Sequence, residues 1–169
     1  YDLETLGGGG FRIRRAGDGE TLVTLDGVER SLAPRDLLIC DAKDVPIGVA
    51  GIMGGRDSEI SLGTTSVALE VAWFEPEGIG QSVPHLGLRS EASARFERGV
   101  DPYAIDLAIE RFAGLLRETC PSLVVHAGSA DVRAASLPEP TRSTRVRTAR
   151  VNALLALSIT DADIVGLLN

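Results

Sequence analysis

The chain has 169 residues, and its 17 basic and 24 acidic side chains give a net charge of −7. With 44% hydrophobic residues it is typical of a globular protein of one or two domains, and not of a disordered chain. The negative charge disfavours a dedicated binder of nucleic acid or anionic membranes. No apolar stretch reaches the roughly 18–20 residues of a membrane helix, so we expect no membrane partner.

The first 75 residues are predicted to be rich in β-strands. Asp26-Gly27 is a pair typical of a two-residue hairpin turn between strands. The four glycines at 7–10 follow no clear strand and precede no helix, which favours a flexible turn over a dinucleotide loop. The expected strands are residues 11–15, 21–25, 28–32, 37–40 and 47–53.

Residues 66–73 form the longest strand-like run of this half. Its alternation puts Val67, Leu69 and Val71 on one face and the smaller or polar side chains, among them Glu70, on the other. Glu70 is a lone carboxylate between two apolar residues, and such a group needs a partner or a polar cavity. Taken alone, this pattern favours a structural hydrogen bond over a ligand contact.

The chain becomes helical after Phe74. Ser90 can cap a helix over 90–98, and Gly99 can end it in the left-handed conformation. A second helix with a 3.6-residue apolar period runs from Pro102 to about Cys120, and 123–125 is a short strand candidate. Pro84 is expected to disturb any helix before residue 87. These elements together predict a mixed α+β fold, with a β-rich first half and helices packed on a sheet.

The C-terminal part has a different character. Residues 134–140 contain two prolines and are predicted to be a linker, which separates a domain at 1–133 from a segment at 141–169. Two short helical patterns, 151–157 and 161–168, are too short to bury a core of their own. The chain starts without a methionine and ends directly after an apolar helical run, so we expect it to be part of a longer protein.

Few residue patterns point to known catalytic or metal sites. Cys40 and Cys120 have no close metal or redox spacing, and each is expected to be a small buried hydrophobic residue. His85 and His126 are expected to be satisfied or surface histidines. Neither a catalytic residue nor a metal site is therefore assigned.

Two glycine- or serine-containing segments remain as candidates. Gly51-Ile-Met-Gly-Gly55 ends an apolar strand, where the backbone can approach a ligand closely; a tight turn is an equally good interpretation. At the start of the helix over 90–98, free backbone amides offer a seat for an anionic or carbonyl group. Glu91 and Arg95 are spaced to form an ion pair on that helix.

These stretches, in this order, resemble the B3/B4 module of the bacterial phenylalanyl-tRNA synthetase β subunit. The most specific match is Leu86-Gly-Leu-Arg-Ser-Glu-Ala-Ser, followed by Arg95-Phe-Glu-Arg-Gly-Val-Asp-Pro102. The match also covers Tyr1-Asp-Leu3, Thr21 to Gly27, Gly51 to Gly55 and Val67 to Phe74. Residues after Pro140 resemble the start of that family's next domain, B5.

The resemblance implies that the module hydrolyses tyrosine wrongly attached to the phenylalanine tRNA. It implies that Glu70 recognises the tyrosine hydroxyl and that Ser90 takes the place of the family's usual threonine. Ala92, Gly54 and Gly51 are then expected to line the same pocket. No catalytic residue is implied by the matched motifs.

For the full synthetase, the resemblance implies ATP and Mg²⁺ as cofactors, with none in this piece. It also implies the tRNA(Phe) acceptor end and an α subunit as partners, in a heterotetramer located in the cytoplasm. An alternative remains open, in which the chain is a structural or tRNA-binding module of the β subunit without editing activity. A free-standing RNA-binding or trans-editing domain is disfavoured by the B5-like tail.

Overall fold

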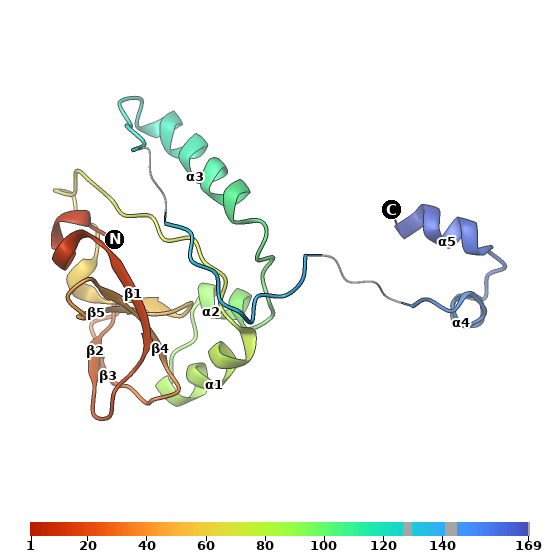
Figure 1. Ribbon diagram of the computed structural model, residues 1–169, viewed down its shortest axis with the longest axis horizontal. Coiled ribbons are helices and arrows are strands. Elements are labelled where there is room, and N and C mark those ends of the chain that lie inside the picture. Colours follow the sequence, from red (N-terminus) through yellow and green to blue (C-terminus); the bar gives the residue numbers. More distant parts are fainter. Residues whose placement is uncertain (127–129, 141–144, 169) are drawn as a thin grey trace. The chain divides into compact units, whose positions relative to one another are not determined.

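A computed structural model describes residues 1–126, 130–140 and 145–168 of the chain (Figure 1). Its contacts divide the chain into two compact units, Tyr1–Asp131 and Val132–Asn169, which are described separately below. Residues 141–144 and 169, which belong to the predicted C-terminal segment, lie outside the described residues. The division into 1–133, 134–140 and 141–169 stays a prediction.

A four-stranded antiparallel sheet forms the centre of the first unit, in the order β1-β4-β5-β6. Leu38, Ile39 and Cys40 of β4 are almost completely buried, because β4 lies between two strands and carries an unbroken apolar run. The antiparallel sheet in the first half, followed by helices, confirms the predicted α+β class (Figure 1). The strands are β1 (Phe11–Arg15), β4 (Leu37–Asp41), β5 (Pro46–Val49) and β6 (Met53–Gly54).

A separate hairpin is made by β2 (Thr21–Val23) and β3 (Glu29–Ser31). Both strands are shorter than predicted, because the chain turns over Thr24–Val28 and not over two residues only. The hydroxyl of the fully buried Thr24 donates to Asp26 Oδ1 at 2.6 Å, which holds the side chains of this turn together. The Leu25 N–H donates to the Gly54 carbonyl at 3.0 Å, so the hairpin is joined to β6.

The predicted strand over 66–73 is wrong as a regular strand. Only Val67 forms a bridge, with Asp2, although backbone hydrogen bonds also join Tyr1 to Ala68 in both directions. The pairing runs only from Ser66 to Ala68, opposite Tyr1 to Leu3, where the 3₁₀-helix η1 (Leu3–Thr5) begins. Side chains still alternate between two faces along this segment, but the small ones face inward. Ala68 and Ala72 pack on the core, while the larger Val67 and Leu69 are exposed.

Helix α1 (Pro76–Leu86) covers the sheet with Ile79, Val83 and Leu86. The helix continues through Pro84, contrary to the expectation that this proline would disturb it. Pro84 removes one N–H, which would otherwise bond the Gly80 carbonyl, but both residues are exposed, so water can bind that carbonyl instead. Gly87 then ends the helix with a φ of 59°, and its N–H donates to the Pro84 carbonyl.

Helix α2 (Glu91–Phe96) is capped by Ser90 as predicted, and its last turn ends two residues earlier than expected. Gly99 has a φ of 87°, which confirms the predicted left-handed residue. The rings of Phe74 and Phe96 lie 5.2 Å apart between centroids and join α2 to the segment before α1.

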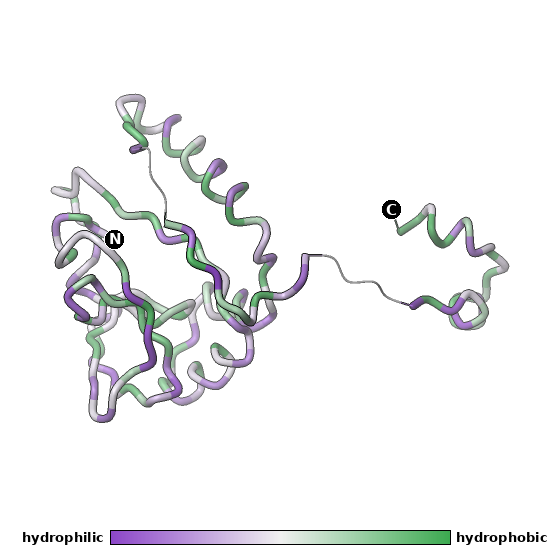
Figure 2. Tube along the Cα trace, viewed as in Figure 1, coloured by the Kyte–Doolittle hydropathy of each residue, from purple (hydrophilic) through white to green (hydrophobic). Residues whose placement is uncertain are grey.

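Helix α3 (Ile105–Thr119) starts three residues after Pro102 and has no fully buried residue. Hydrophobic and hydrophilic residues follow each other along its turns (Figure 2). Residues 123–125 form no strand, contrary to the prediction. Cys40 is buried as expected, but Cys120 at the end of α3 is exposed, contrary to the prediction.

The second unit contains α4 (Thr148–Leu155) and α5 (Asp161–Leu168). Helix α4 begins three residues before the predicted pattern, and α5 has the predicted bounds. The Asn152 amide bonds the backbone of Ile159 in both directions, at 3.0 and 3.1 Å, so this side chain closes the loop between the helices.

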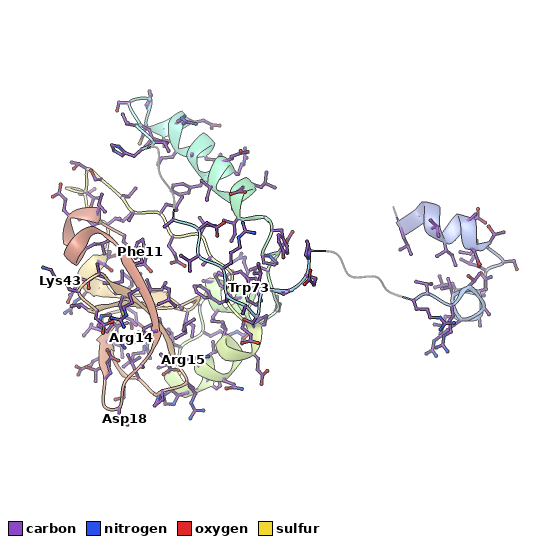
Figure 3. The ribbon with its side chains drawn as sticks, viewed as in Figure 1. Phe11, Arg14, Arg15, Asp18, Lys43 and Trp73 are labelled. Carbon is purple, nitrogen blue, oxygen red and sulfur yellow. The ribbon has the colours of Figure 1, made fainter. Side chains whose placement is uncertain are left out.

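Two further 3₁₀ turns complete the first unit, η2 (Gly7–Gly9) and η3 (Arg56–Ser58). In η2, Gly8 has a φ of 77°, which explains why glycines stand in this turn. Arg14 of β1 pairs with Glu20 at 2.7 Å and with Asp44 at 2.8 Å, and its side chain is labelled in Figure 3. These pairs tie the edge strand to the neighbouring loops.

Candidate functional site

Glu70 lies in the extended segment that pairs with the start of the chain. Its side chain is partly buried, and burial raises the pKa of the carboxyl above its usual range. A hydrogen bond from the Tyr1 hydroxyl to Glu70 Oε2, 3.3 Å long, opposes this rise. The partner that a carboxylate between apolar residues needs is therefore a phenol from the chain itself.

Tyr1 is not among the site residues predicted from the sequence. Its backbone is held by two hydrogen bonds with Ala68, and its ring packs against Phe11 with 5.4 Å between centroids. Burial, followed by the charge of Glu70, raises the pKa of the Tyr1 phenol well above its usual value. The only sequence signal for Tyr1 is that it begins the first matched motif.

Gly48 and Gly54 lie opposite each other on β5 and β6, next to the Tyr1 phenol. A Cβ atom on Gly48 would lie 3.3 Å from the Tyr1 hydroxyl and 3.3 Å from the Gly54 Cα. A Cβ atom on Gly54 would instead point to Leu25, at 3.4 Å. The structure thus brings Glu70, Tyr1, Gly48 and Gly54 together. An isolated glycine inside an apolar strand is a signal that could have identified Gly48.

Ser90 and Gly51 belong to a second contact, between α2 and the connection of β5 to β6. The Ser90 hydroxyl donates to the Ile52 carbonyl at 2.5 Å. Gly51 has a φ of 68°, and a Cβ atom there would lie 2.9 Å from both Ile79 and Phe74. Gly51 is therefore required by the packing beneath the connection, and its immediate neighbours are core side chains.

The start of α2 is less open than predicted. The Ser90 N–H donates to Ser93 Oγ at 2.9 Å, and the Ser93 N–H donates to Ser90 Oγ at 3.0 Å. This capping box uses two of the amides that were expected to be free. Ala92 is exposed on the first turn, so a larger side chain has room there. The predicted pair of Arg95 and Glu91 is present at 3.1 Å, on the solvent side.

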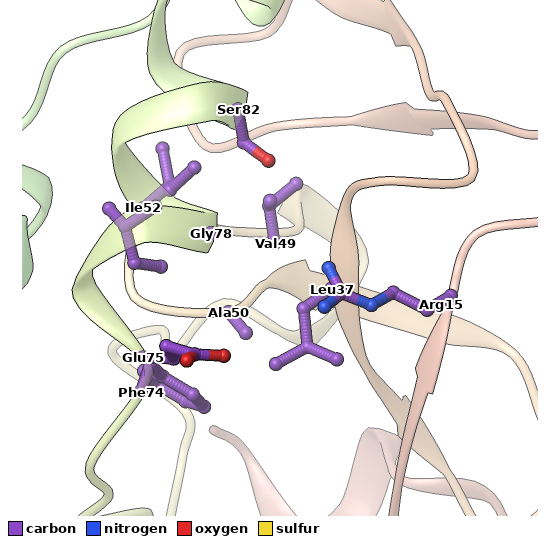
Figure 4. A pocket seen from close by; sticks show the side chains of 10 residues that line it. Arg15, Leu37, Val49, Ala50, Ile52, Phe74, Glu75, Gly78 and Ser82 are labelled. Atoms are coloured by element: carbon purple, nitrogen blue, oxygen red, sulfur yellow. The ribbon is translucent and has the colours of Figure 1, made fainter. Parts of the chain in front are cut away.

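A small cavity of about 30 Å³ lies between the sheet and α1 (Figure 4). Its lining is mostly apolar, and the side chains of Arg15 and Glu75 point into it from opposite sides. This volume holds one or two water molecules at most, and the lining includes none of the five predicted site residues. The cavity is thus distinct from the surroundings of Glu70.

His85 Nε2 is 3.6 Å from Oδ2 of the buried Asp36, and His126 is exposed. Over residues 1–126, 130–140 and 145–168, no three His, Cys, Asp or Glu side chains are grouped closely enough to hold a metal ion. In the same ranges, no helix combines the length and the apolar character needed to cross a membrane.

Comparison with known proteins gives one family and many relatives. Residues 1–121 match the B3/4 domain family. The chain is 42% identical to the phenylalanine–tRNA ligase beta subunit of Anaeromyxobacter dehalogenans, over 96% of this chain and 20% of the relative. It is 44% identical to the beta subunit of Nitratidesulfovibrio vulgaris, over 94% of this chain and 19% of the relative. The chain therefore spans about a fifth of the length of these relatives.

Proposed function

The chain belongs to the B3/4 domain family, and from this membership we propose that it is an editing domain of a phenylalanine–tRNA ligase β subunit. In this proposal it hydrolyses tyrosine wrongly attached to tRNA(Phe). The observation that carries the proposal is the partly buried Glu70 carboxylate, which accepts a hydrogen bond from a phenol hydroxyl at 3.3 Å. A group that binds one phenol in this way is suited to recognise the phenol of a tyrosyl ester.

An editing site separate from the synthetic pocket can select tyrosine because a buried polar group left without a partner costs free energy. An apolar synthetic pocket rejects an added hydroxyl poorly, whereas a site built to bind that hydroxyl rejects the analogue without it. Phenylalanine would leave the acceptor oxygen of Glu70 without a partner, which costs roughly 1–3 kcal/mol for a buried group. Glu70 would therefore favour tyrosyl over phenylalanyl esters.

The proposed reaction is ester hydrolysis. Water attacks the carbonyl carbon of the aminoacyl ester, the bond to the ribose oxygen breaks, and this oxygen takes a proton while free tyrosine leaves. We assign no catalytic residue; in the proposal, backbone groups and the terminal ribose hydroxyl orient the water. Gly54, Gly51, Ser90 and Ala92 line the pocket around the aminoacyl group.

The rest of the proposal concerns the whole ligase that would contain this chain. The relatives are β subunits of phenylalanine–tRNA ligases from other organisms. We propose that it charges tRNA(Phe) with phenylalanine in the cytoplasm, as a heterotetramer with an α subunit, and that ATP and Mg²⁺ serve this step outside the present chain. Residues 1–133 are the editing domain, 134–140 a linker and 141–169 the start of a B5-like domain. With a net charge of −7, this chain would contact only the acceptor end of the tRNA.

The test is deacylation of tyrosyl-tRNA(Phe) by the 169-residue chain and by the ligase that contains it. Glu70→Ala is expected to slow deacylation at least tenfold, since it removes a charged acceptor worth roughly 1.5–3 kcal/mol. Glu77→Ala, on the exposed side of α1, is the matched control. The proposal fails if Glu70→Ala clears tyrosyl-tRNA at the rate of the parent.

A second candidate is a structural or tRNA-binding module without editing activity. It is favoured by one observation, that Ser90 contacts the β5–β6 connection, which contains Gly51, while Glu70 contacts Tyr1, so the predicted residues form two separate contacts. This candidate predicts that the parent itself does not deacylate tyrosyl-tRNA in the whole ligase. The same experiment therefore decides between the two candidates.

A further inference from the structure

The phenol of Tyr1 is fixed against Glu70 from three sides. Its backbone is paired with Ala68 through bonds of 3.1 and 3.0 Å, and its ring packs on Phe11. The missing side chain of Gly48 makes room for the hydroxyl, since a Cβ atom there would lie only 3.3 Å away. The bond from the hydroxyl to Glu70 Oε2 joins residues that are 69 positions apart in the sequence. Such a contact depends on the fold and not on the local chain.

We infer that Tyr1 is a specificity-determining positioning residue, whose hydroxyl holds Glu70 Oε2 and thereby presents Oε1 to the hydroxyl of a tyrosyl ligand. This inference rests on the proposed function, because it assumes that Glu70 recognises that hydroxyl. A carboxylate offers about four acceptor positions, so it accepts from two phenols at the same time. Among the residues that the structure describes, Oε1 receives no hydrogen bond.

The charge state of Glu70 depends on the same contact. Burial raises the pKa of the Glu70 carboxyl, while the Tyr1 hydrogen bond lowers it. Removal of the Tyr1 hydroxyl leaves burial less opposed, so the pKa of Glu70 rises further. A protonated carboxyl loses the charge that makes it a strong acceptor, and without Tyr1 its orientation is no longer fixed.

The test uses Tyr1→Phe, which removes the hydroxyl and keeps the ring on Phe11. The probes are L-tyrosinamide and L-phenylalaninamide, whose binding to the 169-residue chain is followed by NMR titration. The parent is expected to prefer the tyrosine derivative, and Tyr1→Phe is expected to reduce this preference about tenfold. Tyr103→Phe, which removes a hydroxyl from the other tyrosine, is the matched control and keeps the preference of the parent.

A second measurement separates positioning from a general loss of structure. The Glu70 carboxyl carbon is titrated by NMR, and its midpoint is expected at a higher pH in Tyr1→Phe than in the parent. The thermal unfolding midpoint is measured on the same samples and is expected to change little.

The outcomes distinguish this inference from the proposed function. A parent without preference for the tyrosine derivative overturns both. A parent with that preference, together with a Tyr1→Phe variant that keeps or increases it, overturns the role of Tyr1 alone. An increase would mean that the Tyr1 hydroxyl competes with the ligand and does not position Glu70.

Discussion

The Ser90 hydroxyl donates a hydrogen bond to the Ile52 carbonyl at 2.5 Å and accepts one from the Ser93 N–H at 3.0 Å. One side chain thus caps α2 and fixes this helix to the β5–β6 connection. Ile52 directly follows Gly51, whose backbone has a left-handed φ of 68°. Ser90 and Gly51, two of the predicted site residues, are therefore joined through the backbone of Ile52.

Ser90→Ala is expected to destabilise the fold by about 1–3 kcal/mol. The loss combines a helix cap worth roughly 1 kcal/mol with a hydrogen bond worth roughly 1 kcal/mol. Ser90→Thr keeps the hydroxyl and is expected to stay within about 0.5 kcal/mol of the parent. Urea denaturation of the three proteins measures the free energies of unfolding. Equal stability of Ser90→Ala and the parent would contradict the role of this hydroxyl.

The partly buried position of Glu70 predicts a pH dependence of stability. Burial raises the pKa of the carboxyl in the folded state, so the folded state holds its proton up to a higher pH than the unfolded state does. The ionised Glu70 carboxylate therefore destabilises the folded state. Its contribution to the free energy of unfolding becomes less favourable as the pH rises through the raised pKa. Glu70→Gln keeps an acceptor for Tyr1 and removes the charge.

Glu70→Gln is therefore expected to unfold at a higher temperature than the parent at about pH 8, with an advantage that shrinks toward about pH 4. Thermal unfolding followed by circular dichroism across this range measures both proteins. The same comparison with Glu77→Gln, an exposed glutamate on α1, is expected to show a difference that does not vary in this way. A constant offset between Glu70→Gln and the parent would be incompatible with burial as the cause.

The sequence alone predicts the elements whose signals are local. Strand β1, helix α5 and the capping of α2 by Ser90 follow from alternation, periodicity and cap chemistry within a few residues. The interpretation of 66–73 as a regular strand is wrong because pairing depends on a distant partner, and the pairing with residues 1–3 extends only from Ser66 to Ala68. The lone charge of Glu70 in an apolar run predicts a structural hydrogen bond, whereas its role in a site is implied only by the family resemblance.

Other features of the site depend on contacts between distant residues. Tyr1 meets Glu70 across 69 positions, and no spacing or composition rule connects them. The room for the Tyr1 hydroxyl comes from Gly48, through the pairing of β5 with β6. Pro84 is expected to disturb a helix before residue 87, and the helix tolerates it because the one carbonyl left without its intrahelical bond, at Gly80, lies on the exposed side. These relationships are set by tertiary packing, which overrides local preference.

Asp41 is expected to be one of the more sensitive carboxylates of the fold. It accepts backbone hydrogen bonds from Val45, Gly7 and Lys43, each 2.9 Å long, and these bonds hold its pKa below the usual range. The stability that this carboxylate provides is present above the usual carboxyl range and is lost as the pH falls through the lowered pKa. Asp41→Asn replaces one acceptor oxygen by an N–H₂ group that faces backbone donors.

Asp41→Asn is thus expected to lower the urea midpoint clearly at neutral pH, and the difference from the parent is expected to shrink below about pH 3. Asp57→Asn is the matched control, because the Asp57 side chain is 95% exposed. If both variants lost stability equally, the three backbone bonds would have no special role.

The two cysteines are expected to react very differently. Cys40 lies in the core of β4, where burial raises the pKa of its thiol, whereas Cys120 is exposed at the end of α3. A thiol reagent is expected to label the exposed Cys120 within minutes and the buried Cys40 only after denaturation. The thiolate is the reactive form, and burial disfavours it at Cys40. Mass spectrometry of the labelled peptides identifies the site. Fast labelling of Cys40 in the native protein would contradict its position in the core.

Gly51 and Gly54 allow the fold and the site to be tested separately. Gly51 has a φ of 68°, and a Cβ atom there would lie 2.9 Å from Ile79 and Phe74. Gly51→Ala is therefore expected to cost about 2–4 kcal/mol, from the left-handed backbone and the overpacking together. A Cβ atom on Gly54 makes only an ordinary contact with Leu25, so Gly54→Ala is expected to stay within about 1 kcal/mol.

If Gly54 lines the proposed pocket, Gly54→Ala slows the deacylation of tyrosyl-tRNA in a protein that unfolds like the parent, while Gly51→Ala loses activity and stability together. Urea denaturation and deacylation of the same preparations give both quantities. Full activity of Gly54→Ala would place the aminoacyl group away from β6. A stable Gly51→Ala variant would instead show that the β5–β6 connection shifts to make room, and that Gly51 is not required for packing.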